Sequence, residues 1–222
     1  MTAGFIVGKP ALLVIDMQHD FVDPGAGCYA VGAEEIVPAL RRLIDFVRTR
    51  SIPIVFTQEA HRPSGVDAGR EADAGSGWAY PGGGTSASAV PPHCIEGTRG
   101  IEIVDELRPL PEDIRIVKRR YSCFLGTDLD LILRQLGIET LLVTGVCSNV
   151  CVLWTVGDAF QRDYHVRVVE DCIAGSSAEE NNAAALIMRA LVSAGRPVQS
   201  GDVTDALADV GRAPAPLQGR EA

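Results

Sequence analysis

Short runs of apolar residues alternate along this chain with segments whose apolar residues recur at helical spacing. Ala11–Ile15 is uniformly apolar, as expected of a strand that is covered on both faces. Ala33–Thr49 then places Ile, Val and Leu residues three and four positions apart, which favours an amphipathic helix. This alternation predicts an α/β fold in which a mainly parallel sheet lies between two layers of helices.

The alternation continues to the last quarter of the chain and predicts a six-stranded sheet. The expected strands are Ala11–Ile15, Pro53–Thr57, Ile114–Val117, Thr140–Val143, His165–Val169 and Pro197–Ser200. The expected helices are Ala33–Thr49, Ile101–Leu107, Asp128–Leu136, Cys151–Arg162, Ala178–Ala194 and Val203–Leu207. We therefore predict one doubly wound, three-layer α/β/α domain over residues 1–210.

Two segments depart from this rhythm. Residues 61–98 are rich in Gly, Pro, Ala and Ser, and they show little periodicity. A loop of that length in a compact domain is usually functional or disordered, and we predict that it covers the functional site. Residues 211–222 are rich in Pro, Gly and Ala, which predicts a flexible C-terminal tail.

Composition narrows the class of protein and its partners. The chain has 222 residues, of which 46% are hydrophobic, so a sizeable core is expected. A net charge of −9 without a long basic run disfavours nucleic acid and anionic membranes as partners. No apolar stretch reaches the ~18 residues typical of a membrane span, and residues 1–10 contain no secretory signal. We therefore expect a cytoplasmic protein whose six cysteines are reduced thiols.

Three polar residues stand at or just beyond the carboxyl ends of three expected strands. Asp16 follows the first strand directly, Lys118 follows the third, and Cys151 follows the fourth by one turn. The carboxyl ends of parallel strands meet at one edge of the sheet, so we expect these side chains to cluster. A thiol, a carboxylate and an ammonium group together are suited to covalent acyl transfer. Asp16 would take the thiol proton, and Lys118 would stabilise the thiolate.

The position of Cys151 at the expected start of a helix adds to this hypothesis. A helix N-terminus offers unpaired N–H groups and a partial positive charge, both of which lower the pKa of a thiol. Backbone N–H groups near Cys147 and Cys151 are candidates for an oxyanion hole. Each residue also has a plain structural explanation, because free cysteines are commonly buried core residues and a strand-end lysine is commonly solvated.

Several segments resemble the isochorismatase-like cysteine hydrolase superfamily. They are Leu12–Phe21 (LLVIDMQHDF), Val117–Phe124 (VKRRYSCF) and Val143–Val152 (VTGVCSNVCV), with further matches at Cys94–Thr98 and Asp158–Ala159. The resemblance implies an isochorismatase-like, Rossmann-like fold and a catalytic triad of Cys151, Asp16 and Lys118. It also implies a cis peptide between Val146 and Cys147. The family usually has Ala or Leu and then Thr where this chain has Cys147 and Ser148, a small change that leaves the triad intact.

The resemblance also implies a reaction. Most members hydrolyse small amides, whereas isochorismatases cleave a vinyl ether and lack the nucleophilic cysteine, so Cys151 favours an amide hydrolase. Ammonia would leave as a thioester forms on Cys151, and water would then hydrolyse the thioester. No cofactor is expected. Thr57–Pro63 (TQEAHRP) looks more like the ureido- and biuret-type members, which predicts a small linear amide or an N-carbamoyl or biuret-like substrate.

Three alternatives stay open. Pro91–Cys94 (PPHC) resembles nicotinamidases, in which that histidine helps to bind a metal, so Glu59, His61 and His93 are a candidate carboxylate–His–His site. Nicotinamidases usually carry Asp rather than Glu at the acidic position, and we therefore predict no metal. A thiol redox or sensor protein would instead use the sulfur atoms of Cys147 and Cys151, and a non-catalytic binding scaffold would use neither.

Contacts to the substrate are expected from residues that flank the triad in sequence. An arginine can pair with a carboxylate or carbonyl group, and aromatic walls exclude water around a planar amide. Each candidate also has an ordinary explanation, as an exposed loop arginine or as a core aromatic residue. The candidates are Gln18, Phe21, Arg62, Tyr121 and Phe124. The resemblance further implies a homo-oligomer, either a dimer or a tetramer.

Overall fold

A single parallel sheet organises the part of the chain that our computed structural model describes, residues 5–69 and 93–210. Its strands lie in the order β3-β2-β1-β4-β5, and every adjacent pair is parallel. The bounds are β1 Lys9–Ile15, β2 Ile54–Glu59, β3 Ile114–Lys118, β4 Ile138–Val146 and β5 His165–Ala174. The predicted α/β fold is confirmed, with five strands rather than six.

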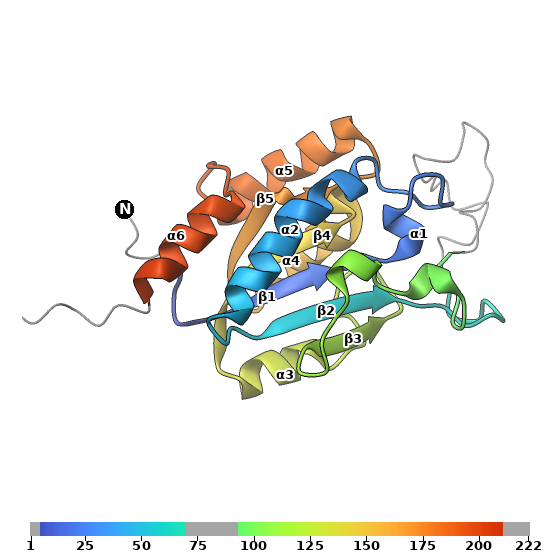
Figure 1. Cartoon of the computed structure of the whole chain (residues 1–222), viewed down its shortest axis with the longest axis horizontal. Helices are drawn as coiled ribbons and strands as arrows, with labels where there is room; N and C mark the ends of the chain where they lie inside the picture. The colour runs from blue at the N-terminus through green and yellow to red at the C-terminus, as the bar shows by residue number, and fades with distance from the viewer. Residues whose placement is uncertain (1–4, 70–92, 211–222) are drawn as a thin grey trace, which may run out of the picture.

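The sequence of the two central strands explains why they lie inside the fold. Every residue of β1 from Pro10 to Ile15 is buried, and so is every residue of β4 except Glu139. A strand that is apolar on both faces can be buried only if helices cover both faces of the sheet. Figure 1 shows this arrangement, with α2 (Ala33–Arg48) and α6 (Ser200–Val210) in front of the sheet and α4 (Leu153–Gln161) behind it.

The remaining elements complete the layers. α5 contacts both β5 and the turn that follows β4, and α3 contacts β4. On α2, the apolar residues that predicted an amphipathic helix form its buried stripe, and Leu40, Leu43, Ile44 and Val47 are buried. The remaining bounds are α1 His19–Val22, α3 Leu129–Gln135, α5 Ala178–Val192, η2 Arg99–Ile101, η3 Asp105–Leu107 and η4 Ser148–Val152.

Three expected elements differ in the structure. The sixth strand, Pro197–Ser200, is reduced to one parallel bridge between Val169 and Val198, and α6 begins at Ser200. The segment Ile101–Leu107 forms two 3-10 turns instead of a helix, because it pairs with the chain that follows β1. There the N–H group of His19 donates to the carbonyl of Glu102. The helix expected from Cys151 begins at Leu153, after the π-helical turn η4.

The predicted covering loop begins and ends at one point of the structure. His61 and Ile95 form an isolated parallel bridge just beyond β2. The N–H group of His61 donates to the carbonyl of Cys94, and that of Glu96 donates to the carbonyl of His61. Residues 70–92, the centre of this loop, and the expected tail at 211–222 lie outside the described residues, so both remain predictions.

Within residues 5–69 and 93–210, no helix combines the length and the apolar character needed to cross a membrane.

Candidate active site

Four polar side chains lie together at the carboxyl edge of the sheet. Asp16 directly follows β1, Glu59 ends β2, Lys118 ends β3, and Cys151 lies in the turn η4 that follows β4. Glu59 and Lys118 are also register partners on adjacent strands. β1 stands where the order of the strands reverses direction, which is the place where doubly wound sheets form ligand sites.

Lys118 is the centre of this cluster. Its Nζ atom lies 2.7 Å from Asp16 Oδ2, 2.9 Å from Glu59 Oε2 and 3.4 Å from Cys151 Sγ. The Cys151 thiol also donates to Glu59 Oε2 at 3.5 Å. All four residues are buried, and Cys151 is 4% exposed. The structure therefore brings together the three residues predicted to form a triad, and it adds a fourth, Glu59.

Backbone geometry holds Asp16 beside β4. Asp16 has a φ of 51°, and its Oδ1 atom accepts a hydrogen bond from the Thr57 hydroxyl at 2.7 Å. Across from it, a Cβ atom on Gly145 would lie 2.0 Å from the carbonyl oxygen of Ile15. Only glycine permits so close an approach of β1 and β4 at this point.

The turn after β4 presents the thiol. The peptide between Val146 and Cys147 is cis, as the resemblance implied. The carbonyl of Cys147 then accepts hydrogen bonds from the N–H groups of Val150 and Val152, at 3.0 Å and 3.1 Å. This winding places Cys151 inside η4 with its sulfur toward Lys118. The oxyanion hole near Cys147 and Cys151 remains a prediction.

The electrostatics of the thiol differ from the expectation. Burial raises the pKa of Cys151 well above its ordinary value, and the charges of Asp16 and Glu59 add to that effect while Lys118 opposes it. The prediction of a lowered pKa left out the burial of the thiol, which is the largest cause of the raised value. Two carboxylates, rather than one, also face the single ammonium group, and Cys151 lies inside a short turn rather than at the N-terminus of a helix.

The two carboxyl groups are driven apart in pKa. Burial raises the pKa of Asp16. The charge of Lys118 lowers that pKa, and the charge of Glu59 raises it and so offsets part of the effect of Lys118. Burial also acts on Glu59, but Lys118 and the hydrogen bond from His61 overcome it and lower the pKa of Glu59. The pKa of Lys118 is raised, because the surrounding negative charge overcomes the cost of burial. Glu59 therefore stays ionised beside a charged Lys118, while Asp16 is the carboxyl group able to hold a proton.

Two of the five expected substrate-binding residues lie beside the cluster. The side chain of Gln18 is buried, and its amide binds the backbone of Glu59 and the carbonyl of Ile101, so it braces the site. Phe21 is buried with its ring edge toward the ring of His93, at 5.8 Å between centroids.

The other three lie differently. Arg62 is exposed and binds Asp67 through its guanidinium group at 2.8 Å. Phe124 stacks on Tyr164, which is a core contact, and Tyr121 is half-buried against the core. None of these observations tests contact with a substrate, so a binding role for these residues remains a prediction.

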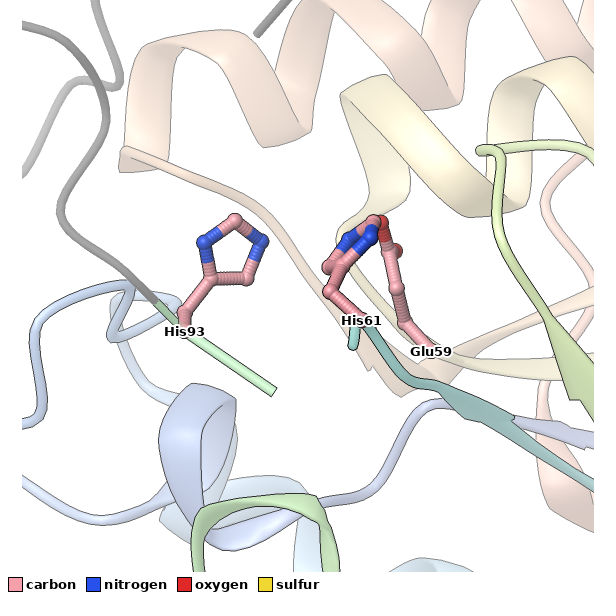
Figure 2. A group of neighbouring side chains, drawn as sticks. All are labelled: Glu59, His61 and His93. Carbon is pink, nitrogen blue, oxygen red and sulfur yellow. The ribbon is translucent and has the colours of Figure 1, made fainter. Parts of the chain in front are cut away.

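Glu59, His61 and His93 lie together, as the metal alternative requires. Figure 2 shows the two imidazole rings and the carboxylate side by side, and one ligand atom from each residue lies within 4.8 Å of the others. Glu59, however, uses both oxygens inside the protein. Oε1 lies 3.2 Å from His61 Nε2, and Oε2 binds Lys118. An ion bound by Oε1 and the two imidazole rings would replace the contact between Glu59 and His61 and would leave Oε2 on Lys118, so the metal alternative stays open.

Comparisons with known proteins agree on one family. A family model described as the isochorismatase domain matches residues 10–201. A probable inactive nicotinamidase of Arabidopsis thaliana is 36% identical, with 81% of this chain and 87% of the relative covered. A ureidoacrylate amidohydrolase of Yersinia enterocolitica is 34% identical, with 75% and 76% covered. The crystal structure of an isochorismatase family protein from Desulfovibrio vulgaris superposes with a TM-score of 0.78 at 34% identity, with 91% and 100% covered.

Proposed function

Since the chain belongs to the isochorismatase family, we propose that it is a cysteine-dependent hydrolase of carbon–nitrogen bonds in small amides. One observation carries the proposal. The ammonium group of Lys118 lies within 3.4 Å of both a carboxylate, Asp16, and a thiol, Cys151. A buried nucleophile held beside a base and a cation is the arrangement that covalent acyl transfer needs.

The reaction follows from these three groups. Asp16 takes the proton of the Cys151 thiol while the sulfur attacks the carbonyl carbon of the amide. Asp16 then returns that proton to the leaving nitrogen, so that ammonia departs and a thioester remains. A water molecule gives a proton to Asp16 as it attacks the thioester, and Asp16 passes that proton to the cleaved sulfur as the carboxylic acid leaves. Lys118 stays charged throughout and balances the negative charge on sulfur.

We favour a small linear amide or ureido substrate, such as an N-carbamoyl or biuret-like compound. Support comes from the relative named as a ureidoacrylate amidohydrolase. The alternative is a nicotinamidase-like activity, which the proximity of His61 and His93 favours, as does the relative named as a probable inactive nicotinamidase.

Release of ammonia from a panel of amides separates the two. The panel contains biuret, N-carbamoyl amino acids, ureidoacrylate, maleamate and nicotinamide, each assayed with and without a chelator. We expect turnover of a linear compound that the chelator does not change. If nicotinamide alone is hydrolysed and the chelator abolishes the activity, the substrate class proposed here is wrong.

We also propose that the protein is a homo-oligomer that acts in the cytoplasm. Large apolar side chains are exposed on the adjacent helices α4 and α5, among them Trp154, Leu186 and Ile187. Exposed apolar residues gathered in this way commonly mark an interface. Light scattering after gel filtration tests this directly, because a monomer would contradict it. The location is supported by the six cysteines, all of which are free thiols in the structure.

A further inference from the structure

We propose that Glu59 is a positioning residue of the catalytic centre, a second carboxylate that holds the Lys118 ammonium and the Cys151 thiol in their reactive arrangement. This inference rests on the hydrolase function proposed above. The sequence offered Glu59 as a metal ligand together with His61 and His93. The inference instead assigns to Glu59 the role of holding the nucleophile and its cation.

The contacts of Glu59 carry the inference. Oε2 lies 2.9 Å from Lys118 Nζ and 3.5 Å from Cys151 Sγ, so one oxygen binds both the cation and the nucleophile. Asp16 uses its own oxygens for Lys118 and Thr57. In the structure, Glu59 is therefore the carboxylate to which the thiol donates its hydrogen bond.

The position of Glu59 is fixed from three directions. Its backbone is the register partner of Lys118 across β2 and β3, which places both side chains on the same face of the sheet. Its backbone N–H and carbonyl groups are both bound by Gln18. Its other carboxylate oxygen, Oε1, lies 3.2 Å from Nε2 of the buried His61. These contacts together hold the Glu59 carboxylate toward Lys118 and Cys151.

The charge balance gives Glu59 a function. With Asp16 and Glu59 both facing Lys118, the cluster carries one more negative charge than positive, which keeps the thiol protonated and makes Asp16 a stronger base. The raised pKa values of Asp16 and Cys151 agree with this arrangement. Proton transfer from Cys151 to Asp16 is then delayed until a carbonyl group is present for the sulfur to attack.

Alkylation of Cys151 tests the role of Glu59 without a substrate. The rate of iodoacetamide labelling of the Cys151 peptide, followed by mass spectrometry from about pH 5 to about pH 10, reports thiolate formation. In Glu59→Gln we expect the apparent pKa of labelling to fall by about one pH unit or more, because a negative charge within hydrogen-bonding distance is lost. In Glu59→Asp the apparent pKa of labelling should fall less. In Glu139→Gln, a matched change at an exposed position of β4, it should not change.

Turnover supplies a second readout on any compound that the wild-type protein hydrolyses. We expect kcat of Glu59→Gln to fall by about tenfold or more with little change in KM, because Asp16 becomes a weaker base and the thiol is no longer oriented. If no compound is hydrolysed, the proposed function fails, but the labelling experiment still decides the role of Glu59.

Two results would overturn the inference. The first is an unchanged pKa of labelling in a folded Glu59→Gln protein. If Glu59→Gln does not fold, the same conclusion follows when Glu59→Asp changes neither the pKa of labelling nor the rate of turnover. The second is stoichiometric retention of Zn²⁺ by the wild-type protein that is lost in both Glu59→Gln and His93→Ala, because Glu59 would then be a metal ligand.

Discussion

Gln18 binds both backbone groups of Glu59, much as a neighbouring strand would. Its Oε1 atom accepts the N–H group of Glu59 and its Nε2 atom donates to the carbonyl of Glu59, each at 2.8 Å. β1 pairs with β2 only as far as Phe56, and the chain then turns away at Asp16, which has a positive φ. A side chain from beyond the turn thus supplies the hydrogen bonds that β1 no longer provides.

Replacing Gln18 with leucine should therefore weaken both the fold and the site. The change leaves the buried N–H and carbonyl groups of Glu59 without partners, and each such group costs about 1–3 kcal/mol. We expect urea denaturation to show a loss within this range or somewhat above it, together with reduced activity. Gln58→Leu is the matched control, because among the described residues the Gln58 side chain makes one hydrogen bond, to the carbonyl of Ile101. Equal stability of the two variants would contradict this account.

The two cysteines of the turn should differ completely in their effect on activity. Cys151→Ala removes the nucleophile and should abolish ammonia release, whereas Cys147→Ala keeps the backbone and should stay active. A covalent adduct at Cys151, detected by mass spectrometry after an electrophilic substrate analogue is added, would confirm the assignment. Loss of function in Cys147→Ala at normal stability would instead favour the thiol redox alternative, and an active Cys151→Ala would exclude a thioester.

Activity should decline in acid at a pH above the ordinary titration range of aspartate. The pKa of Asp16 is raised from 3.8, chiefly by burial, and a protonated Asp16 cannot accept the thiol proton. We therefore expect kcat/KM to fall as the pH drops through this raised pKa. Thr57→Val removes a hydrogen bond that lowers the pKa of Asp16, so it should move the acid limb to higher pH. Thr140→Val, a change at the opposite end of the sheet, should leave the limb in place, and a shift of Thr57→Val toward lower pH would refute the role of Asp16.

Lys118 should matter for stability as much as for chemistry. In Lys118→Met the carboxylates of Asp16 and Glu59 are left buried without their cation, which we expect to cost about 3–5 kcal/mol in the free energy of unfolding. Adding Asp16→Asn to Lys118→Met should recover part of that loss, because one of the two carboxylates is then neutral. Lys9→Met is the control, since Lys9 is exposed and its side chain bonds only to the carbonyl of Leu136 among the described residues. A Lys118→Met protein as stable as the control would show that the carboxylates are not coupled through Lys118.

Most of the sheet could be predicted from the sequence because a strand that is buried on both faces is a continuous run of apolar residues. Ala11–Ile15 is continuously apolar, and the structure extends this strand by only two residues, to Lys9. Pro197–Ser200 has one aliphatic residue, Val198, and it pairs at a single bridge. The segment Ile101–Leu107 has helical spacing, yet its hydrogen bonds go to the chain after β1, a contact that no local pattern reveals.

The site was predictable where a polar residue interrupts an apolar run. Asp16, Lys118 and Cys151 show this signal, and the structure brings them together. The sequence offered Glu59 only as a possible metal ligand, because its contact with Lys118 depends on the register of β2 and β3. The signal at Glu59 was weaker, because Thr57 and Gln58 separate it from the apolar run Ile54–Phe56. The pKa of Cys151 was mispredicted chiefly because the burial of the thiol depends on the whole fold, and partly because the charge of Glu59 was not counted.

The bridge between His61 and Ile95 bears on how this protein can evolve. The chain leaves β2 and returns to it at this bridge, and the described ends of the intervening stretch make further contacts, such as that of Asp67 with Arg119. Because both ends meet at one point, the length of that stretch can change while the strands that carry Glu59 and Lys118 stay in register. Insertions and deletions there can therefore accumulate without rebuilding the catalytic groups.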